Sequence, residues 1–187
     1  MILGALLVQP GHGYAVRSYL ENNLTGIWRI ATSQLYNALR KLEEQSLISS
    51  RVEAQETRPD KRTFRATPAG EKRFFEWFFT PIDKVRDLRV ELLAKLFFVE
   101  QLGLDGGQAM ITAQNEALRE LKATLEETLS GMPVSYDALV LSQKIATVRV
   151  WLEWIQSDVI PFLNEAQNND DDLSRTEKTF PGSLPTT

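Results

Sequence analysis

The stretch of sequence that decides the fold covers residues 32–67 and reads TSQLYNALRKLEEQSLISSRVEAQETRPDKRTFRAT. Its first third predicts a helix, because Leu35, Leu39 and Leu42 recur at helical spacing and form one apolar face. The following segment, SRVEAQ, alternates polar and apolar side chains, which is typical of a strand. The segment RTFRAT alternates again after a polar turn. Residues 32–67 therefore predict one amphipathic helix followed by a two-stranded hairpin.

The faces of this helix that point away from the leucines carry side chains able to hydrogen-bond base edges or phosphates. These candidate DNA-binding residues are Thr32, Ser33, Gln34, Tyr36, Asn37, Arg40 and Lys41. Residues near the start of a recognition helix reach base edges first, so we expect Gln34 and Asn37 to read bases. Arg40 and Lys41 follow a turn later and should bind phosphates. The alternative is an ordinary surface helix with a solvated face, and Tyr36 can instead be partly buried.

Capping residues place the starts of two helices. Thr32 or Ser33 can accept a backbone N–H bond at the start of the first helix. Thr67 and Pro68 suit the N-cap and N1 positions of the next helix, which follows the hairpin. That helix is rich in aromatic residues and ends at a Thr-Pro pair, which marks the expected domain boundary after residue 80.

The turn and the second strand of the hairpin are basic. Four cationic residues fall within eight positions, against the single acidic residue Asp60. These candidate wing contacts are Arg58, Lys61, Arg62 and Arg65. Basic side chains on a projecting hairpin suit the DNA backbone beside the groove that the helix enters, as in a winged helix-turn-helix. Solvation of a surface loop is the simpler alternative.

The composition is that of an ordinary globular chain, with 43% hydrophobic and 25% charged residues. The absence of cysteine excludes disulfides and thiolate metal sites and is consistent with a cytoplasmic protein. No stretch is apolar for long enough to span a membrane. Residues 1–79 hold 11 Lys and Arg against 8 Asp and Glu, whereas residues 80–187 hold 10 against 17. The cationic excess therefore lies in the half that contains the hairpin, which favours DNA as its partner.

The expected elements divide the chain into three parts. Two short helices precede the helix and hairpin, so residues 1–80 predict a winged helix-turn-helix DNA-binding domain. Residues 81–167 have helical patterns throughout and predict a helical dimerisation domain. Residues 168–187 are polar and predict a disordered tail. The fold class we expect is mainly α with a small β-hairpin wing.

The last helix, expected from about residue 135 to 166, carries a coiled-coil-like seam. Seven apolar residues alternate in spacings of four and three, as at the a and d positions of a heptad. They are Leu141, Ile145, Val148, Leu152, Ile155, Val159 and Phe162. Packing against the two preceding helices covers part of this wide surface, and we expect a second copy of the chain to cover the rest in a homodimer. Pro161 should kink the helix near its end.

Four segments of the chain carry motifs of a known family. They read LGALLVQPGHGYAVRSYLE, SQLYNALRKLEEQSLISS, ETRPDKRTFRATPAGE and DLRVELLAKLFF. In this order and spacing they resemble the opening helices, recognition helix, wing and C-terminal start of the PadR family of bacterial transcription regulators. The resemblance covers nearly the whole chain apart from the tail. It implies a homodimer that binds an inverted repeat in double-stranded DNA, represses transcription and, as in some members, binds a small aromatic effector.

The residue types also limit other functions. His12, the only histidine, lies in an expected turn of sequence PGHG, where a structural hydrogen bond is a simpler role than catalysis. No phosphate loop, paired-carboxylate motif or metal-ligand spacing occurs, so we expect neither an enzyme nor a metal or other cofactor. The tryptophans are core residues on the simplest interpretation, and otherwise they line an effector cavity between the domains. They are Trp28, Trp77, Trp151 and Trp154. The main competitor to DNA binding is a winged-helix module that binds only proteins.

Overall fold

The computed structural model describes residues 1–24, 26–53 and 61–165, apart from the side chains of Glu53 and Lys61. The predicted tail, residues 168–187, lies outside the described residues. The chain divides into two compact units, Met1–Leu104 and Asp105–Thr187. The division follows residue 104 rather than residue 80, so the predicted functional domains do not coincide with the compact units and their boundary stays a prediction. No helix among the described residues is long and apolar enough to cross a membrane.

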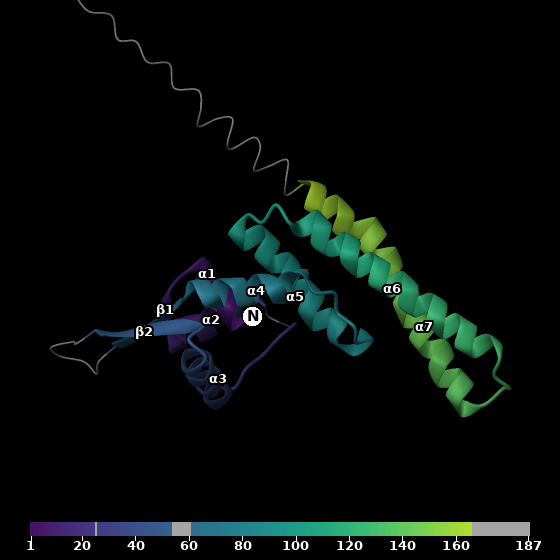
Figure 1. Ribbon diagram of the computed structural model, residues 1–187, viewed down its shortest axis with the longest axis horizontal. Coiled ribbons are helices and arrows are strands. Elements are labelled where there is room, and N and C mark those ends of the chain that lie inside the picture. Colours follow the sequence, from purple (N-terminus) through teal and green to yellow (C-terminus); the bar gives the residue numbers. More distant parts are fainter. Residues whose placement is uncertain (25, 54–60, 166–187) are drawn as a thin grey trace, which may run out of the picture. The chain divides into compact units, whose positions relative to one another are not determined.

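The first unit contains five α-helices, three short strands and one 3-10 turn among its described residues (Figure 1). In chain order they are α1 (Ile2–Val8), β1 (Gly11–His12), α2 (Gly13–Asn23), α3 (Thr32–Glu44), β2 (Ile48–Glu53), β3 (Lys61–Ala66), α4 (Pro68–Phe79), η1 (Val85–Asp87) and α5 (Leu88–Leu102). The predicted helix and hairpin of residues 32–67 are α3, β2 and β3. The mainly helical fold with a small antiparallel sheet is confirmed.

The sheet has the strand order β1-β3-β2, and both pairings are antiparallel. The turn expected at residues 10–13 is wrong, because Gly11 and His12 pair with β3 instead. His12 then serves as the N-cap of α2, and its Nδ1 accepts a hydrogen bond from the backbone N–H of Ala15 at 3.1 Å. The histidine thus has the structural hydrogen bond that the sequence favoured.

The start of α4 is fixed in the way that the sequence predicts. The Thr67 hydroxyl accepts a hydrogen bond from the Gly70 N–H at 3.1 Å, and Pro68 occupies the first turn. Gly70 also lies directly against the turn between α3 and β2, since a Cβ placed there would come within 1.9 Å of the Leu47 carbonyl oxygen. A glycine is therefore required for this close approach of helix to turn.

The core of the first unit is aromatic at its centre. Phe74 and Phe78 of α4 are fully buried, and the ring of Phe98 from α5 packs edge-on against Phe74 at 5.4 Å between centroids. Buried Lys95 of α5 donates from Nζ to the carbonyl oxygen of Thr80 at 2.6 Å. Burial lowers the pKa of this lysine to about 8, although Glu91 opposes the shift. These contacts explain why α5 belongs to the first unit rather than to the C-terminal helices.

The second unit is a helical hairpin of α6 (Gly107–Ser130) and α7 (Tyr136–Trp154), which lie alongside each other (Figure 1). A π-helical segment, η2 (Ile155–Val159), continues α7, and helix resumes to residue 165. Four residues of the predicted dimer seam are buried within the single chain. They are Ile145, Val148, Ile155 and Val159, none more than 5% exposed. The heptad pattern there reflects intrachain packing, because an antiparallel helical hairpin needs the same spacing.

The seam also changes phase near its end. Leu163 is buried with 1% of its surface exposed, whereas the predicted seam residue Phe162 is 38% exposed. A π-helical turn holds more residues than an α-helical turn, so each later side chain is displaced around the helix axis. Pro161 lacks a backbone N–H and follows η2 closely, in agreement with an irregularity near this proline.

Candidate nucleic-acid interface

The recognition helix α3 presents one polar face on an apolar base. Leu35 and Leu39 are buried in the first unit, and Leu42 is half-buried. The residues of α3 that were predicted to contact DNA are all exposed. They are Thr32, Ser33, Gln34, Tyr36, Asn37, Arg40 and Lys41. The leucine spacing thus turns these side chains outward as a set. Asn37 accepts a hydrogen bond from Arg40 at 3.4 Å, and this exposed contact can exchange for DNA.

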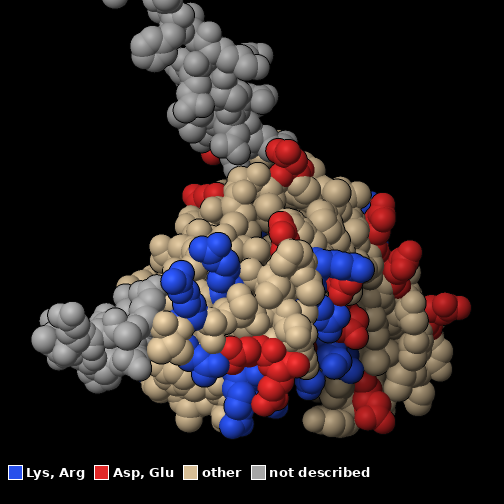
Figure 2. Space-filling model, turned by 60° about the vertical axis from the view of Figure 1, so that its left-hand side comes forward, with Lys and Arg blue, Asp and Glu red and all other residues tan. Residues whose placement is uncertain are grey.

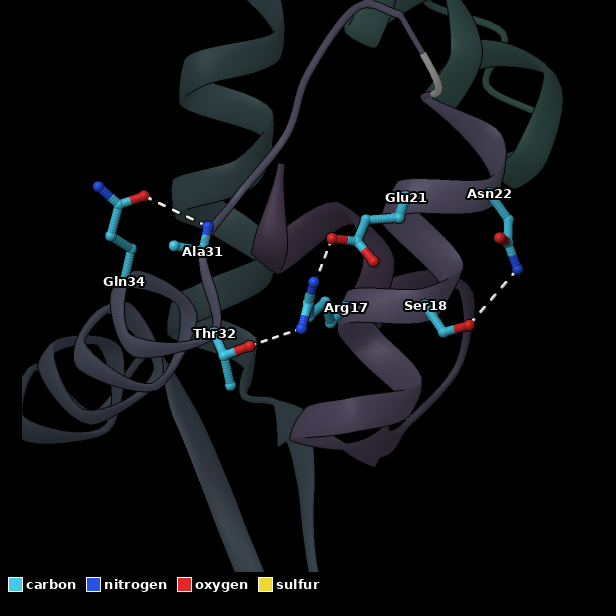
Figure 3. Close-up of polar contacts among 7 residues, drawn as sticks. All are labelled: Arg17, Ser18, Glu21, Asn22, Ala31, Thr32 and Gln34. Atoms are coloured by element: carbon cyan, nitrogen blue, oxygen red, sulfur yellow. Dashed lines mark hydrogen bonds and ion pairs between the residues drawn. The ribbon is translucent and has the colours of Figure 1, made fainter.

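The N-terminus of α3 differs from its predicted form. Ala31 is the N-cap and no side chain caps the helix, so the predicted capping by Thr32 or Ser33 is wrong. Gln34 instead reaches back, and its Oε1 accepts a hydrogen bond from the Ala31 N–H at 3.4 Å (Figure 3). This long, exposed bond leaves the Gln34 side chain easy to displace.

Arg17 of α2 connects the two helices of the helix-turn-helix. Its Nη1 donates to the Thr32 hydroxyl at 2.5 Å and its Nε donates to Glu21 at 2.9 Å, as Figure 3 shows. Thr32 is therefore occupied in holding α3 against α2. Arg17 also lines an open hollow of about 490 Å³ together with Arg29 and the residues before α3. Neither arginine was predicted as a site residue, and the one signal in the sequence was the i,i+4 pair of Arg17 with Glu21.

Tyr36 has a structural contact in addition to its exposed surface. A Cβ on Gly13 would come within 2.8 Å of the Tyr36 ring, so the tyrosine packs on the start of α2. Tyr36 remains 48% exposed. The partial burial of Tyr36 is therefore observed, since the ring rests on α2, whereas its contact with a sugar or phosphate stays a prediction.

The wing carries its predicted arginines on opposite faces. In the register of β2 and β3, Arg62 pairs with Val52 and lies on the same strand face as buried Phe64. Arg65 is exposed on the other face. Arg58 lies outside the described residues, and so does the side chain of Lys61.

Arg62 is bound to the body of the domain. Its Nη2 donates to Glu43 of α3 at 2.6 Å and its Nε donates to the Ser50 hydroxyl at 2.8 Å. Ser50 in turn donates to the other carboxylate oxygen of Glu43 at 2.6 Å. The Ser50 hydrogen bond lowers the pKa of Glu43, partial burial opposes this shift, and Arg62 lowers the pKa further. The predicted phosphate contact is thus already paired with a carboxylate.

The charged surface is mixed rather than uniformly basic. Figure 2 shows lysine and arginine side chains grouped on one face with acidic side chains among them. An open hollow of about 250 Å³ lies between α3 and β3, lined by Asn37 and Arg40 as well as by Glu43 and Arg62. Within the described residues, no group of three or more acidic or histidine side chains could hold a metal ion.

The four tryptophans are half-buried and divided between the units. Trp77 donates from its indole N–H to Glu91 at 3.1 Å, and its ring lies tilted against the Phe74 ring with centroids 5.7 Å apart. Trp151 and Trp154 form an edge-to-face pair with centroids 5.5 Å apart. Trp28 belongs to the first unit, as Trp77 does. None of the four belongs to the fully buried core, so both the core interpretation and a shared effector cavity stay predictions.

Comparison with known proteins gives matches along most of the chain. The crystal structures of Bacillus subtilis PadR in complex with operator DNA and in complex with p-coumaric acid are 23% and 22% identical. Their TM-scores are 0.39 and 0.34. The matches cover 83% and 87% of this chain, and 95% and 96% of the two PadR chains. The negative transcriptional regulator PadR of Bacillus subtilis is 24% identical over 167 residues, which are 83% of this chain and 92% of that protein.

Two family descriptions match consecutive parts of the sequence. Residues 2–76 match the transcriptional regulator PadR-like family, and residues 88–158 match the C-terminal region described as virulence activator alpha. Transcriptional regulators of this kind are not enzymes. The chain belongs to the PadR-like family of transcriptional regulators.

Proposed function

We propose that this regulator binds double-stranded DNA sequence-specifically as a homodimer and represses transcription from an inverted-repeat operator. The observation that carries the proposal is the outward polar face of α3 on its buried leucines. Arg17 holds this helix at its start, and the Glu43 ion pair with Arg62 holds it near its end. A helix fixed at both ends can present side chains to the major groove in one geometry.

The exposed residues of α3 divide into two proposed roles. Gln34 and Asn37, in the first half of the helix, read base edges. Arg40 and Lys41 contact phosphates on the flanking backbone. Thr32 holds the start of the helix through Arg17, Ser33 contacts backbone beside it, and Tyr36 packs on α2 while its exposed edge meets the backbone. In the wing, we assign phosphate contact to Arg58, Lys61 and Arg65.

The dimer we propose uses the part of α7 that the hairpin leaves uncovered. Tyr136, Leu139 and Val150 are 79%, 66% and 62% exposed. Burying such apolar surface against a second copy is favourable by about 25 cal/mol per Å² of apolar area. Of the predicted seam residues, Leu141 and Leu152 are half-buried and Phe162 is exposed, so these three also remain partly accessible to a second copy.

Repression and its release are proposals by analogy. The relative in Bacillus subtilis is a negative transcriptional regulator, and that protein has been crystallised with p-coumaric acid. We extend repression, and release by a small aromatic effector, to this chain, and we place it in the cytoplasm with the DNA it would bind.

The test is DNA binding across a range of salt concentrations, on an operator selected from random sequences and on scrambled DNA. We expect tighter binding to the operator, with log K falling linearly with log salt by about 0.9 for each phosphate contacted. Lys41→Ala should reduce that slope by about one unit on both DNAs. Lys144→Ala, an exposed lysine of α7, is the matched control and should leave it unchanged. If the protein binds neither DNA, even at low salt, a module that binds only proteins is favoured instead.

A further inference from the structure

Three side chains form a closed hydrogen-bonded ring between the recognition helix and the wing. Arg62 donates to Glu43 and to Ser50, and Ser50 donates to Glu43, with all three distances between 2.6 and 2.8 Å. Both carboxylate oxygens of Glu43 accept a bond. The guanidinium carbon of Arg62 also lies 5.4 Å from the centre of the Phe64 ring, which restricts it from a further side. We name these three residues, Glu43, Ser50 and Arg62, the wing clamp.

The wing clamp connects the end of α3 to both strands of the wing, beyond the turn that joins α3 to β2. Glu43 lies in the last turn of α3, and the turn to β2 is set by Ser46 with a φ of 57°. The Thr67 hydroxyl donates to the Ser46 carbonyl at 2.8 Å, which fixes that turn. Ser50 and Arg62 lie further out along β2 and β3. A connection at this distance from the base restricts rotation of the wing relative to α3.

The charges of the clamp argue against a phosphate role for Arg62. Glu43 already neutralises the guanidinium, so a phosphate that replaced Glu43 as its partner would break two charge-assisted bonds and leave a carboxylate beside the DNA. Arg65, in contrast, is exposed on the opposite strand face. The side chains of Asn37 and Arg40 line the same hollow as Glu43 and Arg62, so the clamp borders the proposed base-reading face.

We propose that the wing clamp sets the angle between the recognition helix and the wing, and that Arg62 is a positioning residue for DNA recognition rather than a phosphate contact. This inference rests on the proposed function. It predicts that removing the negative charge of Glu43 harms operator recognition. Simple electrostatics predict the reverse, because removing an anion near DNA strengthens binding.

The experiment measures affinity for operator and scrambled DNA for Glu43→Ala, Arg62→Ala and the double variant. We expect the ratio of the two affinities to fall about tenfold in each single variant, comparable to one misplaced base contact. The double variant should lose no more than either single variant, because the residues act as a unit. The salt slope of Arg62→Ala should equal that of the wild type. Arg62→Lys should behave like Arg62→Ala, because an ammonium cannot donate in the same fork geometry.

Glu44→Ala is the matched control. Glu44 is the neighbouring, exposed carboxylate, whose ion pair with Arg40 is long at 3.9 Å. Glu44→Ala removes one negative charge, as Glu43→Ala does, but outside the clamp. The affinities for operator and for scrambled DNA should therefore rise together, and their ratio should stay constant. The inference is overturned if Glu43→Ala matches Glu44→Ala. It is equally overturned if Arg62→Ala lowers the salt slope by about one unit with equal losses on both DNAs.

A second measurement separates failure of the clamp from failure of the proposed function. Urea unfolding of the wild type, Glu43→Ala, Arg62→Ala and the double variant gives the coupling energy between Glu43 and Arg62 in the absence of DNA. If Glu43 and Arg62 are coupled but the protein binds no DNA, the clamp exists, whereas the proposed function and the role of the clamp in recognition are both contradicted. If the coupling energy is zero, the clamp itself is contradicted. The pair is partly exposed, so these variants should fold. Ser50→Ala, which removes one hydroxyl, provides a milder variant with the same expected direction.

Discussion

Replacement of Gly70 by alanine should destabilise the first unit strongly, although alanine is the better helix former. In an open helix the change favours the folded state by about 0.5–1 kcal/mol. Here the new Cβ would lie 1.9 Å from the Leu47 carbonyl oxygen and 2.9 Å from its carbon, where ordinary contacts begin at 3.4 Å. Both neighbours are backbone, so no side chain can rotate away, and α4 must move off the turn between α3 and β2.

We expect a net loss of roughly 3 kcal/mol, at the upper end of the usual cost of overpacking. For a unit of about 100 residues, this corresponds to a fall in melting temperature of roughly 12–20 °C. The assay is urea and thermal unfolding followed by circular dichroism. Gly131→Ala is the matched control, because a Cβ there meets nothing within 4 Å, and it should change stability little. If Gly70→Ala has the same melting temperature as the wild type, the close packing of α4 on this turn is refuted.

Three other predictions concern recognition, charge burial and assembly. Gln34→Ala and Asn37→Ala should each reduce the preference for operator over scrambled DNA by roughly 1–3 kcal/mol at fixed salt, and equal losses on both DNAs would remove them from base reading. Lys95, with a folded pKa of about 8 against an ordinary 10.5, binds fewer protons folded than unfolded between these values. Urea stability should therefore rise with pH across this window, and Lys95→Met should flatten that rise. Leu139→Glu with Val150→Glu should give folded monomers in sedimentation, whereas a wild type that is monomeric at micromolar concentration contradicts the dimer.

The elements of the first unit follow from short-range features of the sequence. The leucine spacing of α3, the alternation of β2 and β3, and the Thr67 cap with Pro68 each act within a few residues. Their physical causes are helical and strand periodicity and the satisfaction of backbone N–H groups at a helix start. A reader of the sequence can therefore locate the recognition helix and hairpin, and the outward polar face of α3 follows from the inward leucines.

The dimer seam shows where periodicity stops being informative. Ile145 and Val148 have the spacing of a coiled coil, and yet α6 of the same chain covers them. The spacing of apolar residues shows that one face of a helix must be buried, but it does not identify the segment or chain that buries it. The phase change from Phe162 to Leu163 depends on a π-helical turn, which has no signature in the spacing of apolar residues.

The partners of charged and polar groups were decided only by the tertiary structure. Arg62 has the sequence context of a phosphate contact, but Glu43, nineteen positions earlier, lies beside it once β3 pairs with β2. Lys95 likewise finds the Thr80 carbonyl only because α5 packs on α4. Sequence determines which side chains carry charge and which helix face they share, because these properties are local. Their neighbours depend on the packing of distant segments, so the roles of these groups became visible only in the folded chain.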